Sequence, residues 1–188
     1  MVKIRGINQY SFWDLKYKPT ANPKGMFLAG GVWYDIYLLN SEHITNGTSK
    51  AGATIAGGAE YGRAIPKIPL EYGGNGTLTY GKFTWFQACE IGKAHGKRPV
   101  NYAEFPTVAY GVNEQKSSLV NAYETVAGKI EHYPNLTSKY GMEQATGVQR
   151  IWGSDVQGIG GDGWKTGLTD GRGDIYAYAN QPTAVILG

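Results

Sequence analysis

The sequence contains a single cysteine, Cys89, in 188 residues. This excludes an intrachain disulfide and, with three histidines, argues against a structural zinc site. Long apolar runs are also missing, since no stretch approaches the ~20 apolar residues of a membrane span. The opening residues, Met-Val-Lys-Ile-Arg-Gly, lack the apolar core of a secretory signal. We therefore expect no membrane span and no signal peptide in this chain.

Charge is limited as well. Charged residues make up 18% of the chain, the formal net charge is +3, and basic and acidic residues alternate along the sequence. A protein that binds nucleic acid normally concentrates basic residues on one face or in one segment. Nucleic acid is therefore not expected as a partner.

Glycine and aromatic residues are abundant instead. The chain has 28 Gly, 14 Tyr and 5 Trp, and 41% of its residues are hydrophobic. This composition is typical of a domain with many turns and irregular loops anchored by large aromatic side chains. Because the length and the apolar content suit one core, we expect residues 1–188 to form a single domain.

Several segments have the composition of β-strands. A half-buried strand is expected within 7–18. Residues 25–39 are apolar and aromatic around a pair of glycines, which predicts either two short strands or one strand bent at that pair. Further strands are expected at 147–153 and 182–188. The stretch 40–81 is rich in Gly, Ser, Thr and Asn, so we expect a long surface excursion with at most short strands.

A first helix is expected in residues 83–95. An apolar stripe runs through Phe86 and Cys89, and Trp85 lies one residue away from it. This spacing predicts one buried helical face, and Gly96 stands where a helix would be capped at its C-terminus.

A second short helix should follow. Asn101 and Glu104 have the spacing of a capping box, in which each side chain accepts a hydrogen bond from the backbone of the other residue. We expect this helix to run to about Tyr110 and to end at Gly111. The polar segment 112–138 is expected to be mainly loop.

Packing is the default role of the aromatic side chains. Trp33, Tyr34 and Tyr37 fall on an expected strand, so we assign them to the core. Trp152 is assigned to the core as well. Trp164 lies beside a long Gly-rich loop, where an aromatic side chain either closes the edge of a core or contacts a ligand. It is the candidate ligand contact of the scaffold.

Little in the sequence indicates catalysis. Cys89 lies on the apolar stripe, where a cysteine is usually a small core residue, whereas reactive thiols need an exposed, electropositive setting. His43, His95 and His132 are far apart in the sequence, and none has the spacing of a metal-binding motif. A catalytic group assembled in space stays open as an alternative, because its members need not be close in sequence.

Calcium is an alternative at one place, the Gly-rich loop after 153. Four aspartates crowd this loop as in some calcium sites, although their spacing is not that of an EF-hand. They are Asp155, Asp162, Asp170 and Asp174. Because Asp and Gly are also ordinary turn residues, we favour the turn interpretation and expect no cofactor.

Segments spread from near the start of the chain to its end carry the motifs of one protein family. They are 8–19, 25–26, 33–39, 43–50, 95–99, 101–105, 109–111, 137–141 and 171–177. With these motifs the chain resembles the variable proteins of diversity-generating retroelements, which include the major tropism determinant of a Bordetella phage. The segment 112–136 shows no match to the family.

The resemblance implies an α+β protein with the C-type lectin fold, which is shared with formylglycine-generating enzymes: two short helices, small antiparallel sheets and long Gly-rich loops. It implies a binding protein rather than an enzyme, placed on a virion tail fibre or a cell surface. The partner would be a host-cell surface protein or another surface ligand, and the phage member suggests a homotrimer.

The resemblance also implies that the ligand-binding residues lie in a C-terminal variable region that begins after a motif like 181–188. We therefore expect the variable contacts after Gly188, and residues 1–188 to be the constant scaffold, truncated before that region. The first and last strands of this fold pair, so the strand in 8–16 should need a missing C-terminal segment or another chain.

Two alternatives stand beside this interpretation: a calcium-dependent carbohydrate-binding lectin, and an oxidase like the formylglycine-generating enzymes. The oxidases need cysteines in their C-terminal part, and this sequence has none after Cys89.

Overall fold

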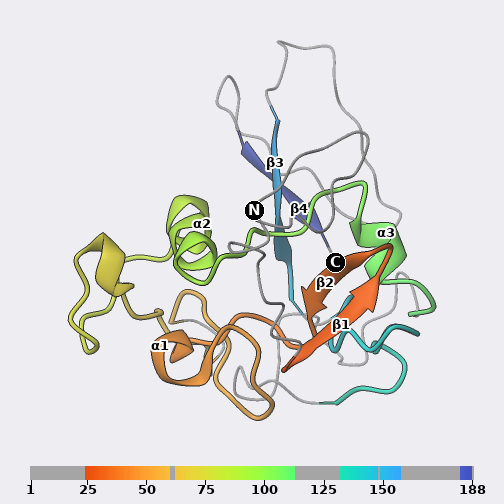
Figure 1. Cartoon of the computed structure of the whole chain (residues 1–188), viewed down its shortest axis with the longest axis horizontal. Helices are drawn as coiled ribbons and strands as arrows, with labels where there is room; N and C mark the ends of the chain where they lie inside the picture. The colour runs from red at the N-terminus through yellow and green to blue at the C-terminus, as the bar shows by residue number, and fades with distance from the viewer. Residues whose placement is uncertain (1–23, 60–61, 113–131, 148, 158–182, 188) are drawn as a thin grey trace, which may run out of the picture.

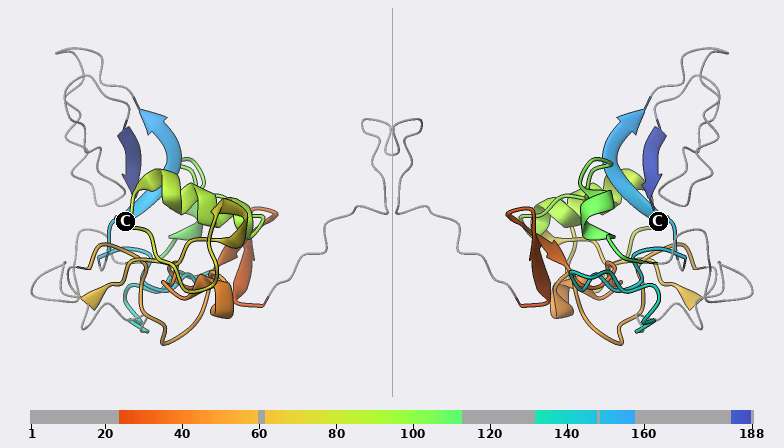
Figure 2. Two further views of the ribbon diagram at one scale, coloured as in Figure 1. Left: turned by 90° about the vertical axis from the view of Figure 1, so that its left-hand side faces the viewer. Right: turned by 90° about the vertical axis from the view of Figure 1, so that its right-hand side faces the viewer.

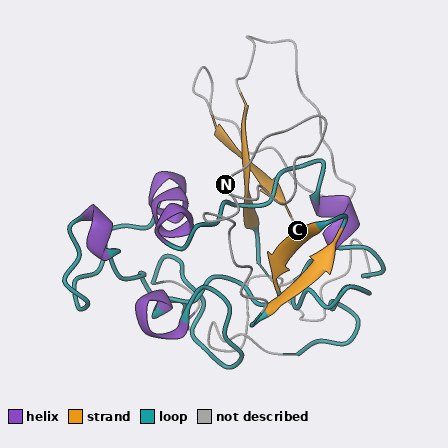
Figure 3. Ribbon diagram, in the orientation of Figure 1, coloured by secondary structure: helices purple, strands orange, loops and turns teal. Residues whose placement is uncertain are grey.

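The computed structural model describes residues 24–59, 62–112, 132–147, 149–157 and 183–187. Within these ranges the chain is an α+β structure in which loops connect short helices and two small antiparallel sheets (Figures 1 and 3). In chain order the elements are β1 (Met26–Ala29), β2 (Val32–Asp35), α1 (His43–Asn46), the 3-10 helix η3 (Leu70–Tyr72), α2 (Trp85–Ala94), α3 (Phe105–Val108), β3 (Ile151–Gln157) and β4 (Thr183–Leu187). None of the helices in these ranges is long and apolar enough to cross a membrane.

Strands β1 and β2 form a hairpin, so the prediction of two short strands around the glycine pair is confirmed. Ala29 lies opposite Val32, and the loop between them is Gly30-Gly31, with φ of 56° and 79°. Both central residues of this two-residue turn need a positive φ, which glycine adopts without steric cost. The turn sets the register, and the register decides which side chains reach the core.

The assignment of Trp33 to the core is wrong. Phe27 and Ala29 point inward from β1 and are buried, whereas Leu28 lies between them on the opposite face. Trp33 is the cross-strand partner of Leu28, and both remain exposed, at 39% and 52%. Side chains on one face of a strand alternate with period two, so the outward position of Leu28 carries Trp33 outward with it. Tyr34 stacks on Phe27 at a centroid distance of 5.6 Å and is partly buried.

The expected helix in 83–95 is present as α2, and local bonds define its ends. The Thr84 hydroxyl accepts the Gln87 N–H, and the Gln87 side chain accepts the Thr84 N–H, which is a complete capping box. The helix ends at Ala94, and Gly96 has a φ of 66° just beyond it. The prediction that Gly96 caps this helix is therefore confirmed.

The apolar face predicted for α2 is partly wrong. Phe86 is 72% exposed, while Ile91 is completely buried and Cys89 is half-buried. At about 100° per residue, Ile91 lies roughly 140° around the helix from Phe86, so one face cannot bury both. The domain covers the side that carries Ile91.

The second helix, α3, begins later and is shorter than predicted, although the hydrogen bonds of the expected box are present. The Glu104 N–H donates to Asn101 Oδ1 at 2.7 Å, and the Asn101 N–H donates to Glu104 Oε2 at 3.1 Å. Only Phe105–Val108 is α-helical, and the chain leaves it through Gly111, which has a φ of 89°. The first and last residues of α3, Phe105 and Val108, have buried side chains that are each 1% exposed.

The excursion between the hairpin and α2 holds together through isolated bridges rather than strands, as the composition predicts. These bridges join Asn40 to Ile55, Ala56 to Ala64, and Lys67 to Thr79. The short helices α1 and η3 lie within it, and neither has a side-chain cap hydrogen bond that would mark its start in the sequence. Figure 1 shows η3 at the side of the molecule opposite α3.

The main core lies where the hairpin, α3 and β4 meet the segment that contains 142–145. Its buried members are Phe27, Ala29, Phe105, Val108, Ala109, Met142, Ala145 and Leu187. Figure 2 shows the hairpin at the edge of the molecule and β3 with β4 beside each other in both side views.

The strand expected at 147–153 begins later and runs further, as β3, and the strand expected at 182–188 is β4. The strand expected in 7–18 lies outside the described residues, and so does its pairing.

Candidate functional site

Strand β4 pairs with β3 in an irregular way, and the irregularity lies in the middle of β3. Trp152 lies opposite Ile186, and Val156 lies opposite Ala184. Four steps along β3 therefore face only two steps along β4, so β3 carries two extra residues in a bulge. A bulge turns backbone and side-chain groups away from the partner strand, and these groups then need other partners.

Three hydrogen bonds supply those partners and hold the bulge to the rest of the domain. They join Trp85 Nε1–H on α2 to the Gly153 carbonyl at 2.8 Å, the Ser154 N–H to the Val100 carbonyl at 2.8 Å, and the Tyr102 N–H to Asp155 Oδ2 at 2.6 Å. Two of the three bonds reach the segment 98–104 that leads into α3. The bulge thus connects β3 to both principal helices, and we call residues 85, 98–104 and 151–155 the strand brace.

An ion pair stiffens the 98–104 part of the strand brace. The Arg98 guanidinium donates to both carboxylate oxygens of Glu104, at 2.9 and 2.5 Å. These charged hydrogen bonds from Arg98 hold the pKa of Glu104 below its usual value, against the opposing effect of burial. The same bonds raise the pKa of Arg98. Because the Arg98 side chain is 55% exposed, the ion pair contributes little to the free energy of unfolding. Its main effect is to hold the segment 98–104 in one conformation.

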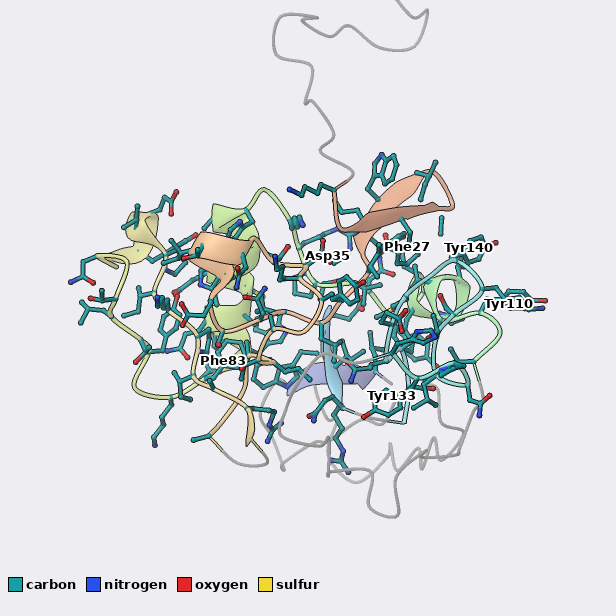
Figure 4. All side chains as sticks on the ribbon, turned by 90° about the horizontal axis from the view of Figure 1, so that it is seen from below. Phe27, Asp35, Phe83, Tyr110, Tyr133 and Tyr140 are labelled. Atoms are coloured by element: carbon teal, nitrogen blue, oxygen red, sulfur yellow. The ribbon has the colours of Figure 1, made fainter. Side chains whose placement is uncertain are left out.

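Aromatic contacts support the strand brace from α2. The rings of Phe83 and Trp152 are 5.3 Å apart, and those of Trp85 and Phe86 meet edge to face at 5.1 Å. Trp152 is half-buried in this contact, in line with the packing role assigned to it. Figure 4 shows Phe83 near the strand pair, on the side away from α3.

The end of β4 is anchored in the core. Leu187 is completely buried and shares the core cluster with Phe105 and Val108 of α3. Its strand partner is Ile151, which packs partly buried against the same cluster. The position of the chain at residue 187 is therefore fixed by packing and by strand pairing together.

Exposed tyrosines gather on the surface just outside this anchor. Tyr110 follows the buried Ala109 and is 58% exposed, and Tyr140 is 46% exposed. Lys139 connects them: its N–H donates to the Tyr110 carbonyl at 2.8 Å, and its Nζ lies 5.0 Å from the centroid of the Tyr110 ring. Figure 4 shows Tyr110 and Tyr140 at the same edge of the molecule, beside α3. We call these three residues the tyrosine surface, and nothing in the sequence marked it in advance.

The candidate ligand contact Trp164 lies outside the described residues. Of the four aspartates considered for calcium, Asp155 alone is described, and it accepts the Tyr102 N–H as part of the strand brace. Among the described residues, no group of three or more His, Cys, Asp or Glu side chains is placed to hold a metal ion.

Cys89 lies half-buried in α2, in line with the packing role expected for it. Burial raises the pKa of its thiol, which lowers the thiolate fraction that a nucleophile needs. The next residue of α2, Glu90, accepts a hydrogen bond from the Tyr80 hydroxyl at 2.8 Å, and burial with this bond raises the pKa of Tyr80. Both groups are therefore held in their neutral, protonated forms.

The structure does bring two of the three histidines together. His43 Nδ1 lies 2.9 Å from His95 Nε2, and His43 Nε2 lies 2.7 Å from the Lys67 carbonyl oxygen. Their separation of 52 residues gave no signal in the sequence. His132 stands apart from this pair and contacts Glu143 at 2.9 Å.

Comparison with known proteins places the chain beside phage receptor-binding proteins. It is 41% identical over 188 residues to the tail fiber receptor-binding protein of Bordetella phage BPP-1, an alignment that covers 97% of this chain and 48% of that protein. The chain thus spans about half the length of this relative. A search against protein-family models gives no match.

Solved structures give the same result. The P3c and M1 variants of the major tropism determinant each superpose with a TM-score of 0.70 at 40% identity, over 96% of this chain and 48% of theirs. The expected resemblance to a variable protein with the C-type lectin fold is therefore confirmed, and so is the α+β fold class.

Proposed function

We propose that this relative of the phage tropism determinants is the scaffold of a receptor-binding display domain, carried on a virion tail fibre or a cell surface. The observation that supports the proposal most is the 41% identity to a tail fiber receptor-binding protein along 97% of the chain. Fold alone would not carry a function, but this identity is found over nearly the whole chain. The chain binds and does not catalyse.

The strand brace suits this function. Display of varied side chains needs a backbone that is fixed before binding, because ordering it at the moment of binding would cost affinity. Bonds from Trp85, Val100 and Tyr102 converge on three consecutive residues of β3, and β3 in turn holds β4. Variable loops on such a support change sequence without refolding the domain.

In this proposal the residues that choose the ligand lie after Gly188, where the chain leaves the anchored end of β4. Residues 1–188 are then the constant scaffold, and the strand expected in 8–16 would be completed by that C-terminal segment or by another chain. The tyrosine surface and Trp164 add constant contacts beside the variable ones. A homotrimer would multiply a weak affinity for a host-cell surface protein through avidity.

Two alternatives predict different chemistry. A calcium-dependent lectin would lose binding when calcium is removed and would be inhibited by free sugar. An oxidase like the formylglycine-generating enzymes would need reactive cysteines, whereas burial raises the pKa of Cys89 and no cysteine follows it in the sequence. The half-buried thiol argues for a packing role.

Cell binding tests the proposal. The chain, expressed with the residues that its gene encodes beyond Gly188, is labelled and incubated with a panel of intact bacterial strains. We expect saturable binding to particular strains that persists in EDTA and is lost when the cells are first treated with protease. Loss of binding in EDTA would support the lectin instead, and binding to none of the strains would contradict a receptor-binding function.

The coding DNA tests the diversification separately. A near-repeat of the segment after Gly188 that differs only at adenines, and lies adjacent to the gene, is expected. Its absence would remove diversification from the proposal and leave the binding scaffold.

A further inference from the structure

The histidine pair joins three segments that are distant in the sequence. His43 on α1 has no exposed surface, and its two ring nitrogens bond to His95, at the C-terminal end of α2, and to the carbonyl of Lys67. The two rings meet edge to face, with centroids 5.2 Å apart. The pair therefore fastens both ends of the excursion, 40–46 and 66–80, to the end of α2.

The Lys67 carbonyl fixes where the protons are. A carbonyl oxygen only accepts hydrogen bonds, so His43 must carry a proton on Nε2. Neutral His43 then has a lone pair on Nδ1, and His95 must donate its Nε2–H to it. In the neutral state this is the one arrangement that makes both bonds.

Protons added to the pair have unequal effects. The first can bind His95 Nδ1, because His95 then still donates its Nε2–H to His43. The second must bind His43 Nδ1, and the two rings would then face each other with an N–H on both sides and two positive charges. We propose that the histidine pair is an acid-sensitive latch, which holds the excursion to α2 while at most one proton is bound and releases it when the second binds.

The charged groups around the pair largely neutralise each other. Lys67 pairs with Glu42 at 2.6 Å, and Lys97 pairs with Asp35 and with the Thr48 hydroxyl. Glu71 is the remaining charged group that acts on His95. Burial outweighs the attraction of these carboxylates and lowers the pKa of both histidines; in His95, the neighbouring His43 lowers the pKa further.

These directions set the sign of the pH dependence. A histidine whose pKa is lowered in the folded state binds protons more readily when unfolded, so stability is complete above the unfolded value of about 6.5 and falls below it. Each proton taken up only on unfolding raises the unfolding equilibrium constant about tenfold per pH unit, and two such protons raise it about a hundredfold.

The first test compares pH profiles of unfolding for the full chain between pH 7.5 and 5. His95→Gln keeps a donor for His43 Nδ1 and removes one titrating ring, so we expect its profile to be shallower than the wild-type profile by about tenfold per pH unit. His132→Gln is the control, because the His132 side chain is exposed and contacts Glu143, which is not part of the histidine pair. This variant should keep the wild-type loss of stability below pH 6.5. Parallel profiles for the wild type and His95→Gln would overturn the latch.

The second test uses the wild-type chain alone and so does not depend on the folding of a variant. Nitrogen NMR of the imidazoles should show His43 protonated on Nε2 at pH 7.5 and both rings titrating below 6.5. Amide exchange, corrected for intrinsic rates, should show that Ser41 and Ala56 lose protection on acidification before Ala109 in the core does. The opposite tautomer of His43, or equal loss of protection at these amides, would refute the proposal.

Discussion

At the scale of single residues, two tryptophans in this domain have opposite roles. Trp85 donates its indole N–H to the Gly153 carbonyl in the bulge of β3. Trp33 lies on the outer face of the hairpin, with 39% of its surface exposed. Because the residue type is the same, the difference between them comes from position alone, and a single substitution can measure it at both sites.

We expect Trp85→Phe to destabilise the chain by about 1 to 2 kcal/mol, since it keeps an aromatic ring but leaves the Gly153 carbonyl without its donor. Trp33→Phe is the matched control and should change stability by less than about 0.5 kcal/mol. Urea unfolding at neutral pH measures both values. Equal losses at the two positions would show that the indole bond to Gly153 contributes nothing.

Residue-scale roles were the least accessible to sequence reasoning. The sequence predicted packing for Trp33 and a buried stripe through Phe86, and both side chains are exposed. A periodic pattern shows which residues share a face, but it does not show which face the rest of the domain covers. That depends on contacts between distant segments, such as those that bury Ile91 and leave Phe86 in solvent.

At the scale of elements, the sequence was more informative, because helix ends and tight turns are determined locally. Three such features are the Asn101 and Glu104 box, the Gly30-Gly31 turn, and the end of α2 at Ala94 with Gly96 just beyond it. Each of them rests on residues within four positions of one another. α3 is nevertheless shorter than its sequence suggests, and the bulge in β3 had no signal. The bulge depends on partners in α2 and in 98–104, which no local pattern of 147–153 could reveal.

The turn after η3 gives a prediction at this scale. A Cβ added at Gly74 would lie 1.8 Å from the Ile68 carbonyl oxygen, whereas one added at Gly81 would meet nothing within 4 Å. The obstacle at Gly74 is backbone, which cannot rotate away as a side chain would. We expect Gly74→Ala to destabilise the chain by at least about 2 kcal/mol and Gly81→Ala by less than about 1 kcal/mol.

Thermal unfolding of the two glycine variants beside the wild type checks this expectation. If Gly74→Ala unfolds at the same temperature as Gly81→Ala, the backbone of the turn after η3 can shift to accept a Cβ without loss of stability. The excursion would then be too loose for the histidine pair to fasten it, so the result bears on the latch as well.

At the scale of the whole molecule, the chain divides its aromatic residues between support and surface. Phe83, Trp85 and Trp152 lie in contacts that steady β3, while Tyr110 and Tyr140 stand exposed beside α3, next to the core that holds the end of β4. Tyrosine suits a contact surface, since it offers a large, rigid ring and a polar tip at low entropic cost.

This division predicts how binding and stability separate, on the premise that the domain binds a receptor. The double variant Tyr110→Ser, Tyr140→Ser should weaken cell binding at least about fivefold, which corresponds to about 1 kcal/mol, and should leave unfolding nearly unchanged because both rings are exposed. Tyr72→Ser is the matched control: Tyr72 is 40% exposed on η3, at the opposite side of the molecule (Figure 1). Binding that responds equally to the control and to the double variant would place the receptor contact elsewhere, and the tyrosine surface would then be ordinary exposed surface.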